Sequence, residues 1–318
     1  MEKNEIVKLF LESGVQLTPE ALEIIFHKQD IIDKLINIIK EKNIILLDEK
    51  NLNEFIGLLE TKDQEVKIEY PEELVEFKTD DVLRLMKERF EVLSKIIEEN
   101  HKLQNIVSLS KIKKVKRKEE VITIGMVKDK TTYSILLEDF TSNEIIQMEA
   151  NIVKRIFYDD VIGVRIKKEG EQVIGDKIFF PSLSFFRKTC FLSEEVLVSK
   201  EWIKFKDKKI PIERREIVKV YINNFKLTLI DVDIIKKYRV ENENYIDILI
   251  SLIERRHLNP SFFISKKVYK KDLFLLNKIP DVIIVFGAEE SIFKVYKGIN
   301  IFFLPNGKVV DLKRKKIE

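Results

Sequence analysis

The segment Glu120-Val121-Ile122-Thr123-Ile124-Gly125-Met126-Val127-Lys128-Asp129-Lys130 decides the fold of the middle of the chain. Its β-branched and apolar residues predict a strand over residues 121–127, because such side chains suit a pleated, half-buried surface. Four further segments predict strands in the same way: residues 134–138, 145–149, 161–166 and 173–180. A short helix is predicted between the third and fourth strands, at residues 152–158. This order is that of an OB-fold β-barrel, which we predict over residues 119–184.

Four aromatic residues lie in or beside these predicted strands: Tyr133, Phe140, Phe157 and Tyr158. OB-fold barrels bind single-stranded nucleic acids by stacking bases on aromatic rings. Aromatic rings also fill barrel cores, and the sequence leaves both roles open.

A dense basic run precedes the barrel. It contains six cations and two apolar residues, and the cations are Lys111, Lys113, Lys114, Lys116, Arg117 and Lys118. Phosphate contacts give affinity that depends on salt and not on sequence, so these six residues are the DNA-binding candidates. The alternative is a solvated loop ahead of the first strand.

The N-terminal fifth of the chain is predicted to be helical. Residues 1–60 contain apolar stripes at helical spacing, and Thr18-Pro19 is a favourable start for a helix, so we predict a small helical domain. Residues 61–118 are interpreted as a polar linker followed by one amphipathic helix over 80–100. One face of that helix is expected to hold its apolar residues, namely Val82, Leu83, Met86, Phe90, Leu93 and Ile97.

Residues 185–318 alternate strand-like and helical segments, which predicts a reduced α/β domain. Two of its strands, at 282–286 and 301–304, are continuously apolar, so we expect both faces of these strands to be buried. The remaining residues of the domain are few, so we expect a partner protein to supply part of that cover. The predicted fold class is thus multidomain α+β.

Composition limits the function classes. The net charge is only +3, although 35% of the residues are charged, so a polyanion would have to bind a local basic patch. We find no apolar run long enough to span a bilayer and no secretory signal at the start, which predicts a cytoplasmic protein without a membrane partner. The single cysteine, Cys190, excludes an internal disulfide. The three histidines, His27, His101 and His257, have no metal-binding spacing.

The segments quoted above resemble the small subunit of the archaeal family D DNA polymerase. Residues 120–130 resemble the opening strand of its OB domain, and Asp160-Val161-Ile162-Gly163-Val164 and Ile178-Phe179-Phe180-Pro181 resemble later strands. Near the C-terminus, Arg255-Arg256-His257-Leu258-Asn259-Pro260 resembles a family motif that follows a helix. Shorter matches follow it in order, at Ile279-Pro280-Asp281, Tyr296-Lys297-Gly298 and Val309-Val310-Asp311-Leu312. The resemblance spans roughly residues 80–318.

The resemblance implies a calcineurin-like phosphoesterase domain at residues 185–318, whose family members use two metal ions to hydrolyse DNA. The metal-binding motifs of the family are degraded in this sequence. After Leu192-Ser193, the family's Asp-x-His reads Glu194-Glu195-Val196. A later histidine is replaced by Asp231, and the final Gly-His-x-His reads Gly287-Ala288-Glu289-Glu290. The degenerate positions are thus Glu194, Val196, Asp231, Ala288 and Glu290, and the central Gly-Asp and Gly-Asn-His-Asp motifs have no counterpart.

These losses predict a non-catalytic small subunit, a pseudo-phosphoesterase without catalytic residues, bound metal or cofactor. By resemblance, its partner is the large catalytic subunit of a replicative family D DNA polymerase, and DNA is contacted through that complex. We expect His257 to be a packed or hydrogen-bonded residue. Two alternatives stay open: an active 3′–5′ exonuclease subunit with a rearranged site, and a stand-alone OB-fold protein that binds single-stranded DNA.

Overall fold

The computed structural model describes residues 2–29, 32, 35–36, 39, 44–60, 66–117, 119–183, 194–206, 208–239, 243–261 and 267–318. Lys118, Cys190, Leu192 and Ser193, named above, lie outside these residues. The chain forms two compact units, Met1–Lys67 and Ile68–Glu318. Among the described residues, no helix is long and apolar enough to cross a membrane.

The N-terminal unit is built mainly from helices. These are α1 (Lys3–Glu12), α2 (Pro19–His27) and α4 (Glu49–Glu60), and two short parallel strands accompany them, β1 (Gln16–Leu17) and β2 (Leu46–Leu47). Thr18 caps α2 as its sequence predicts, since its Oγ1 accepts a hydrogen bond from the Ala21 N–H at 3.3 Å. Fully buried side chains from all three helices, including Phe10, Ile25 and Leu52, form the core.

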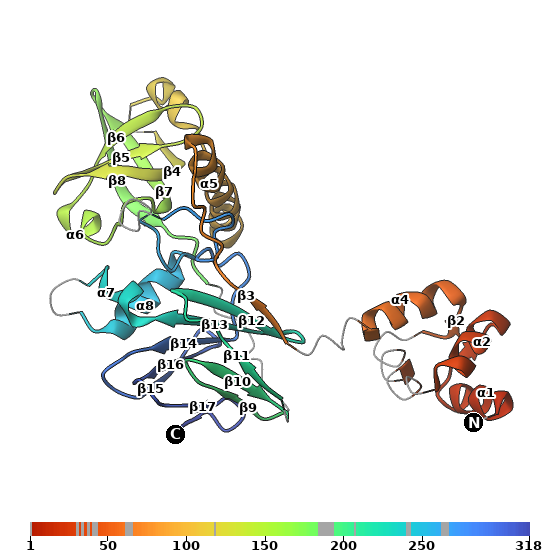
Figure 1. The fold of residues 1–318 in the computed structure, drawn as a ribbon. Coiled ribbons are helices and arrows are strands. Elements are labelled where there is room, and N and C mark those ends of the chain that lie inside the picture. Colours follow the sequence, from red (N-terminus) through yellow and green to blue (C-terminus); the bar gives the residue numbers. More distant parts are fainter. Residues whose placement is uncertain are drawn as a thin grey trace. The chain divides into compact units, whose positions relative to one another are not determined.

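The second unit contains the predicted barrel (Figure 1). Its strands are β4 (Glu120–Lys130), β5 (Ser134–Glu138), β6 (Asn143–Gln147), β7 (Val161–Glu169) and β8 (Gln172–Phe179), with α6 (Ala150–Val153) between β6 and β7. They close in the order β4-β5-β6-β8-β7, with β6 and β8 parallel and the other pairs antiparallel. This is the OB-fold strand order that the sequence predicts. Gly125 lets β4 approach β5 closely, because a Cβ atom there would collide with the Leu137 side chain.

Helix α5 (Thr79–His101) packs on the outside of the barrel. Leu93 and Ile97 contact apolar residues of β4 and β7 in one buried cluster. The predicted apolar face is partly wrong, because Leu83 is 59% exposed while Arg89 is buried. The buried face of α5 thus differs from the predicted one: it includes Arg89, whose guanidinium pairs with Asp272 inside the unit.

The rest of the second unit contains two sheets. The six-stranded sheet has the order β15-β16-β14-β13-β12-β3, in which β13, β14 and β16 run parallel. Its strands are β3 (Lys67–Glu69), β12 (Ile217–Ile222), β13 (Phe225–Asp231), β14 (Val282–Phe286), β15 (Ile292–Tyr296) and β16 (Ile299–Leu304). The five-stranded sheet has the order β11-β10-β9-β17-β18, and its strands are β9 (Val196–Val198), β10 (Trp202–Phe205), β11 (Lys208–Pro211), β17 (Val310–Asp311) and β18 (Lys316–Ile317).

The chain itself covers both faces of the apolar strands β14 and β16. On one face, Ile283 and Val285 join a cluster with residues of α7 (Val232–Lys236) and α8 (Tyr245–Glu254). On the other face, Ile284 is also fully buried, and the five-stranded sheet lies on that side (Figure 1). The expectation that a partner must supply this cover is therefore wrong for the described residues. The strands that supply it are too short and too lysine-rich to be recognised from sequence.

Part of the expected linker is structured. Residues 61–65 lie outside the described part of the chain, but β3 follows directly and pairs with β12 at the edge of the six-stranded sheet. The Leu74 N–H then donates to the Val268 carbonyl at 2.8 Å. The linker interpretation is thus wrong from residue 67 on, because a polar segment serves here as an edge strand.

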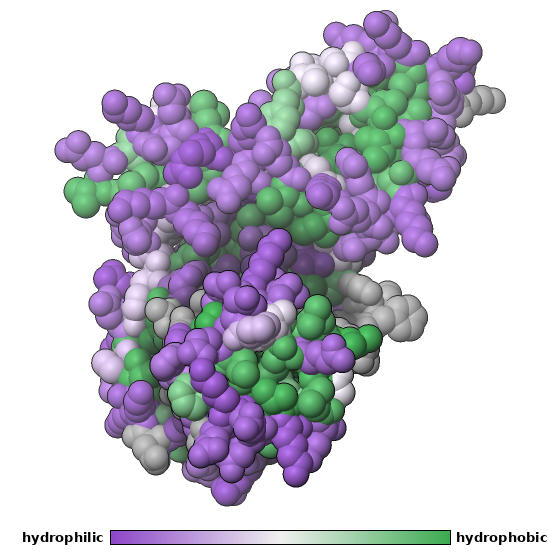
Figure 2. Space-filling model, turned by 90° about the vertical axis from the view of Figure 1, so that its right-hand side faces the viewer, coloured by the Kyte–Doolittle hydropathy of each residue, from purple (hydrophilic) through white to green (hydrophobic). Residues whose placement is uncertain are grey.

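The surface is mostly hydrophilic. On the face shown in Figure 2, hydrophobic side chains gather in patches between hydrophilic ones. Among the described residues of the second unit, Val75, Phe77, Leu83 and Phe140 are large apolar side chains that are each more than half exposed.

Candidate functional site

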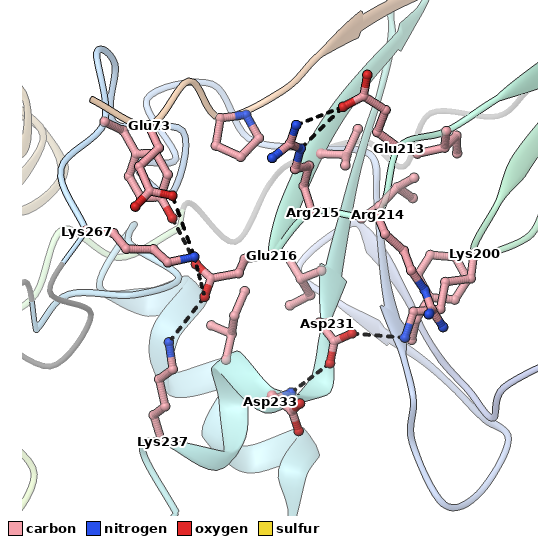
Figure 3. Close-up of a pocket in the computed structure, with 18 residues that line it drawn as sticks. Glu73, Lys200, Glu213, Arg214, Arg215, Glu216, Asp231, Asp233, Lys237 and Lys267 are labelled. Atoms are coloured by element: carbon pink, nitrogen blue, oxygen red, sulfur yellow. Dashed lines mark hydrogen bonds and ion pairs between the residues drawn. The ribbon is translucent and has the colours of Figure 1, made fainter. Parts of the chain in front are cut away.

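The best-formed cavity of the second unit lies at the carboxyl ends of β13 and β14 (Figure 3). Its volume is about 500 Å³, and its apolar wall includes Val218, Leu229 and Phe286 of the six-stranded sheet. The lining also includes Lys200 and Ile212, which adjoin strands of the five-stranded sheet. In open α/β sheets, ligands bind outside the carboxyl ends of parallel strands, so this cavity is the candidate site.

Asp231, one of the degenerate positions, ends β13 at the edge of this cavity. Its Oδ2 lies 3.0 Å from the Lys200 Nζ, and its Oδ1 accepts a hydrogen bond from the Asp233 N–H at 3.1 Å. The same side chain thereby caps α7. Both members of the ion pair are partly exposed, at 21% for Lys200 and 29% for Asp231. A lysine ammonium therefore occupies the charge-compensating position beside this carboxylate.

The turn Gly287-Ala288-Glu289-Glu290, which the resemblance aligns with a histidine motif, lies next to this ion pair. Gly287 has φ +83°, which favours glycine, and a Cβ atom there would lie 3.9 Å from both Asp231 Oδ1 and Lys200 Nζ. The next residue, Ala288, packs against the core cluster, and Glu290 is exposed. The structure thus brings Asp231 and the Gly287-Ala288 turn together but leaves Glu290 in solvent.

The first degenerate motif is divided between core and surface. Val196 begins β9 and is fully buried. Glu194 is partly exposed and lies 3.8 Å from the Lys206 Nζ. Across the described part of the chain, no group of three or more His, Cys, Asp or Glu side chains is arranged to hold a metal ion.

Most other charges in the cavity are paired. Arg215 binds Glu213 at 3.0 Å, and Lys237 lies 3.9 Å from Glu216. Arg214 also lines the cavity and is exposed, and it forms no ion pair among the described residues (Figure 3). Sequence reasoning missed Lys200 and Arg214, because nothing in a single sequence places these residues opposite a strand end that lies far along the chain.

The motif Arg255-Arg256-His257 joins the barrel to the sheets. The Arg255 Nε donates to Asp160 Oδ2 at 3.0 Å, and both side chains are at most 5% exposed. The guanidinium also donates to the Arg155 carbonyl and lies 4.2 Å from the centre of the Phe157 ring. Burial raises the pKa of Asp160, and the neighbouring Arg255 opposes that shift. The Arg256 Nε donates to the Pro181 carbonyl at 3.0 Å.

His257 is buried and fully hydrogen-bonded, as expected. Its Nε2 lies 2.9 Å from Asp272 Oδ2, and its Nδ1 accepts the Asn259 N–H at 3.1 Å. An Nδ1 that accepts a hydrogen bond carries no proton, so the ring is neutral. Burial and the nearby Arg89 accordingly lower the pKa of His257 from 6.5 to about 4. The motif is a structural junction between the barrel, α5 and the sheets.

The basic run forms the end of the barrel. The 3₁₀ helix η3 (Leu109–Lys114) buries Leu109 and Ile112 in the barrel core. Their spacing of three residues matches one turn of such a helix. The remaining described cations of the run are exposed, and none forms an ion pair with another described residue: Lys111, Lys113, Lys114, Lys116 and Arg117. The run is therefore not a free loop, because Leu109 and Ile112 fix it to the barrel core. Its cations nevertheless remain on the surface.

We expect these exposed cations to contribute to DNA affinity. Changing Lys113, Lys114, Lys116 and Arg117 to glutamine should reduce the slope of log affinity against log salt, by slightly less than one unit for each lost phosphate contact. The slope is measured by fluorescence anisotropy of a labelled duplex at several salt concentrations. An unchanged slope in a folded variant would contradict the DNA-contact assignment.

The four candidate aromatic residues have different surroundings. Tyr133 is 64% exposed in the turn between β4 and β5, whereas Phe157 packs against the core cluster and Arg255. Phe140 is 62% exposed, with its ring edge-on to Phe90 at 4.8 Å, and Tyr158 is 40% exposed. Only Phe157 is accounted for by packing alone.

Comparisons with known proteins found limited likeness. No protein-family model matches the sequence, and no curated protein matches it. Among solved structures, the telomere capping protein Ten1 from Saccharomyces pombe is 16% identical, with a TM-score of 0.20, over 23% of this chain and 77% of Ten1. The S. pombe Stn1–Ten1 complex gives the same identity and TM-score over 72% of the matched chain. The hypothetical protein YgiW from E. coli is 11% identical, with a TM-score of 0.21, over 24% of this chain and 88% of YgiW.

Proposed function

We propose that this chain is a non-catalytic accessory subunit of a DNA polymerase, of the kind to which the family D small subunit belongs. In this role, it holds the large catalytic subunit and carries no hydrolytic reaction of its own. The proposal rests on the resemblance of residues 80–318 together with the geometry of the cavity at the strand ends.

The observation that carries the proposal is the Lys200–Asp231 ion pair at 3.0 Å. A two-metal phosphoesterase requires several carboxylate, amide and imidazole ligands that converge at strand ends. Here the one carboxylate that ends β13 is compensated by an ammonium and a backbone N–H. A divalent cation would have to displace Lys200, and the neighbouring degenerate residues Val196 and Ala288 have no ligating atoms in their side chains.

Surface features support a protein partner. Phe77 and Leu83 are more than half exposed at and before the start of α5, and Phe140 is exposed beside Phe90 of the same helix. Exposed apolar side chains of this kind commonly mark protein contacts. The barrel and its unpaired basic run supply a surface suited to DNA held within the complex.

The proposal predicts no divalent-metal-dependent nuclease activity. The purified chain, incubated with a 3′-labelled oligonucleotide and manganese, should release label no faster than in excess chelator. The double variant Glu194→Ala, Asp231→Ala is the matched control for contaminating nucleases and should give the same background. Hydrolysis by the wild-type chain that the double variant lacks would establish the active-exonuclease alternative instead.

The partner is tested by co-expression with a family D large subunit. The expected result is a stoichiometric complex that persists through size-exclusion chromatography and polymerises DNA. Separate elution of the two chains, each folded, would contradict the subunit assignment.

A second candidate function is single-strand binding by the barrel alone. It is favoured by Tyr133, at 64% exposed, and Ile145 on β6, at 55% exposed. Aromatic and apolar side chains on such a barrel can stack with bases. The double variant Tyr133→Ala, Ile145→Ala separates the two functions, since it should weaken single-strand binding strongly only if the barrel binds DNA by itself.

A further inference from the structure

The outer face of the five-stranded sheet carries a row of aligned side chains. In the strand register, Lys204 lies opposite Lys209 on one side and Leu197 on the other, and Asp311 lies opposite Leu197 and Lys316. Side chains directly opposite one another share a face, so these five residues form one row across all five strands. The row spans roughly 19 Å, because neighbouring strands are about 4.8 Å apart.

The three lysines of this row face solvent, whereas Asp311 is buried. The next positions on the same strands, Val198, Ile203 and Val310, are fully buried and point to the other face of the sheet. Lys204, Lys209 and Lys316 are exposed, in contrast. The sheet therefore buries one face in the unit and presents the lysine row on the other.

The lysines of the row carry uncompensated charge. Lys204, Lys209 and Lys316 form no ion pair within the described part of the chain. The one carboxylate in the row, Asp311, is 1% exposed and is compensated by Arg314, whose Nε lies 3.5 Å away. Further cations adjoin the row, because the turn between β17 and β18 reads Lys313-Arg314-Lys315-Lys316. Within the row and this turn, cations outnumber carboxylates, although the whole chain has a net charge of only +3.

Trp202 lies on the same face, two residues before Lys204 on β10. The Lys209 Nζ lies 4.4 Å from the centre of its ring, which is cation–π geometry. An anion that draws the Lys209 ammonium away would change the surroundings of the indole directly. Trp202 is the single tryptophan of the chain, so its fluorescence reports on this face alone.

We propose that the outer face of the five-stranded sheet is a second nucleic-acid contact surface, which binds the phosphate backbone through Lys204, Lys209 and Lys316. This inference is independent of the identity of the protein partner and of the basic run at the barrel. We infer a nucleic acid as the ligand because its phosphates are negatively charged and complement the unpaired lysines on this face. Binding to this face should not depend on the nucleotide sequence, since phosphate contacts do not distinguish one base from another.

The test follows Trp202 emission while the full chain is titrated with unlabelled DNA, in separate single-stranded and double-stranded titrations. We expect a saturable change in emission that reverses at high salt. The same change should persist when Lys113, Lys114, Lys116 and Arg117 are changed to glutamine. Binding seen by anisotropy with constant Trp202 emission would place the DNA elsewhere and overturn the proposal.

A triple variant, Lys204→Gln, Lys209→Gln and Lys316→Gln, measures the contribution of the row. We expect it to lower the salt slope by nearly three units for duplex DNA and by about two units for single-stranded DNA, from three lost phosphate contacts. The matched control removes three exposed lysines that are each paired with an acid on the same helix, Lys87, Lys95 and Lys236, and should retain the slope. Equal slopes in the two triple variants would overturn the proposal. A Trp202 response to polyglutamate but not to DNA would overturn it in favour of an acidic protein.

Discussion

Replacing Arg255 with alanine should destabilise the second unit by about 3–5 kcal/mol, the range found when one partner of a buried ion pair is removed. The substitution leaves the Asp160 carboxylate, 1% exposed, without its guanidinium. It also removes the donor to the Arg155 carbonyl and the cation stacked on Phe157. Asp160 would then have to remain charged in a buried site or take up a proton.

The measurement is equilibrium urea unfolding followed by circular dichroism at neutral pH. Arg165→Ala is the matched control, because Arg165 also forms a two-point contact with an aspartate, Asp176, but at the surface. Exposed ion pairs contribute little, so the control should unfold almost as the wild type does. Equal effects of the two substitutions would show that Arg255 does not join the barrel to the sheets as described.

Acidification should destabilise the second unit between pH 6.5 and about 4, and His257 should be a main cause. Because the pKa of His257 is about 4 in the folded chain and 6.5 when unfolded, the unfolded state binds more protons in this range. Stability from this residue is therefore complete above pH 6.5 and falls as the pH is lowered. A shift of this size corresponds to roughly 3 kcal/mol. The charged groups facing the ring are Arg89, Asp272 and Lys219.

His257→Gln should reduce that pH dependence, although it also costs stability at neutral pH. His27→Gln is the control, because His27 is exposed on α2 in the N-terminal unit. Urea midpoints at several pH values between 4 and 7 provide the comparison. Below that range Asp272 adds a further loss, since its carboxylate is stabilised by His257 and Arg89, which hold its pKa well below the usual value. If the His257 variant retained the full dependence, protonation at another site would be responsible.

The barrel could be predicted from sequence because its strands are rich in β-branched and apolar residues. The strand predicted over residues 121–127 lies within the observed β4, Glu120–Lys130. The helix between the third and fourth strands gave the OB-fold order before any pairing was known. Local pattern was sufficient here because each strand pairs mainly with neighbours close in sequence.

The two-sheet region could not be predicted to the same depth. Strands β9, β17 and β18 contain two or three residues each, which is too short for a periodic signal. β17 pairs with β9, more than a hundred residues earlier in the chain, and no local pattern encodes that contact. The candidate site has the same limit, because the resemblance pointed to Asp231 whereas nothing in the sequence pointed to its partner Lys200.

Strand β3 has a consequence for how the second unit can be isolated. It occupies one edge of the six-stranded sheet, beside β12, and precedes the rest of the unit in sequence. A fragment that begins after Tyr70 would retain the barrel and the other strands of both sheets, but the edge of β12 that faces β3 would lose its hydrogen-bonding neighbour. Unpaired edges of this kind recruit strands from other molecules. The short strand β3 thus helps to prevent self-association through the edge of β12. A fragment designed to stay soluble should therefore include Lys67–Glu69.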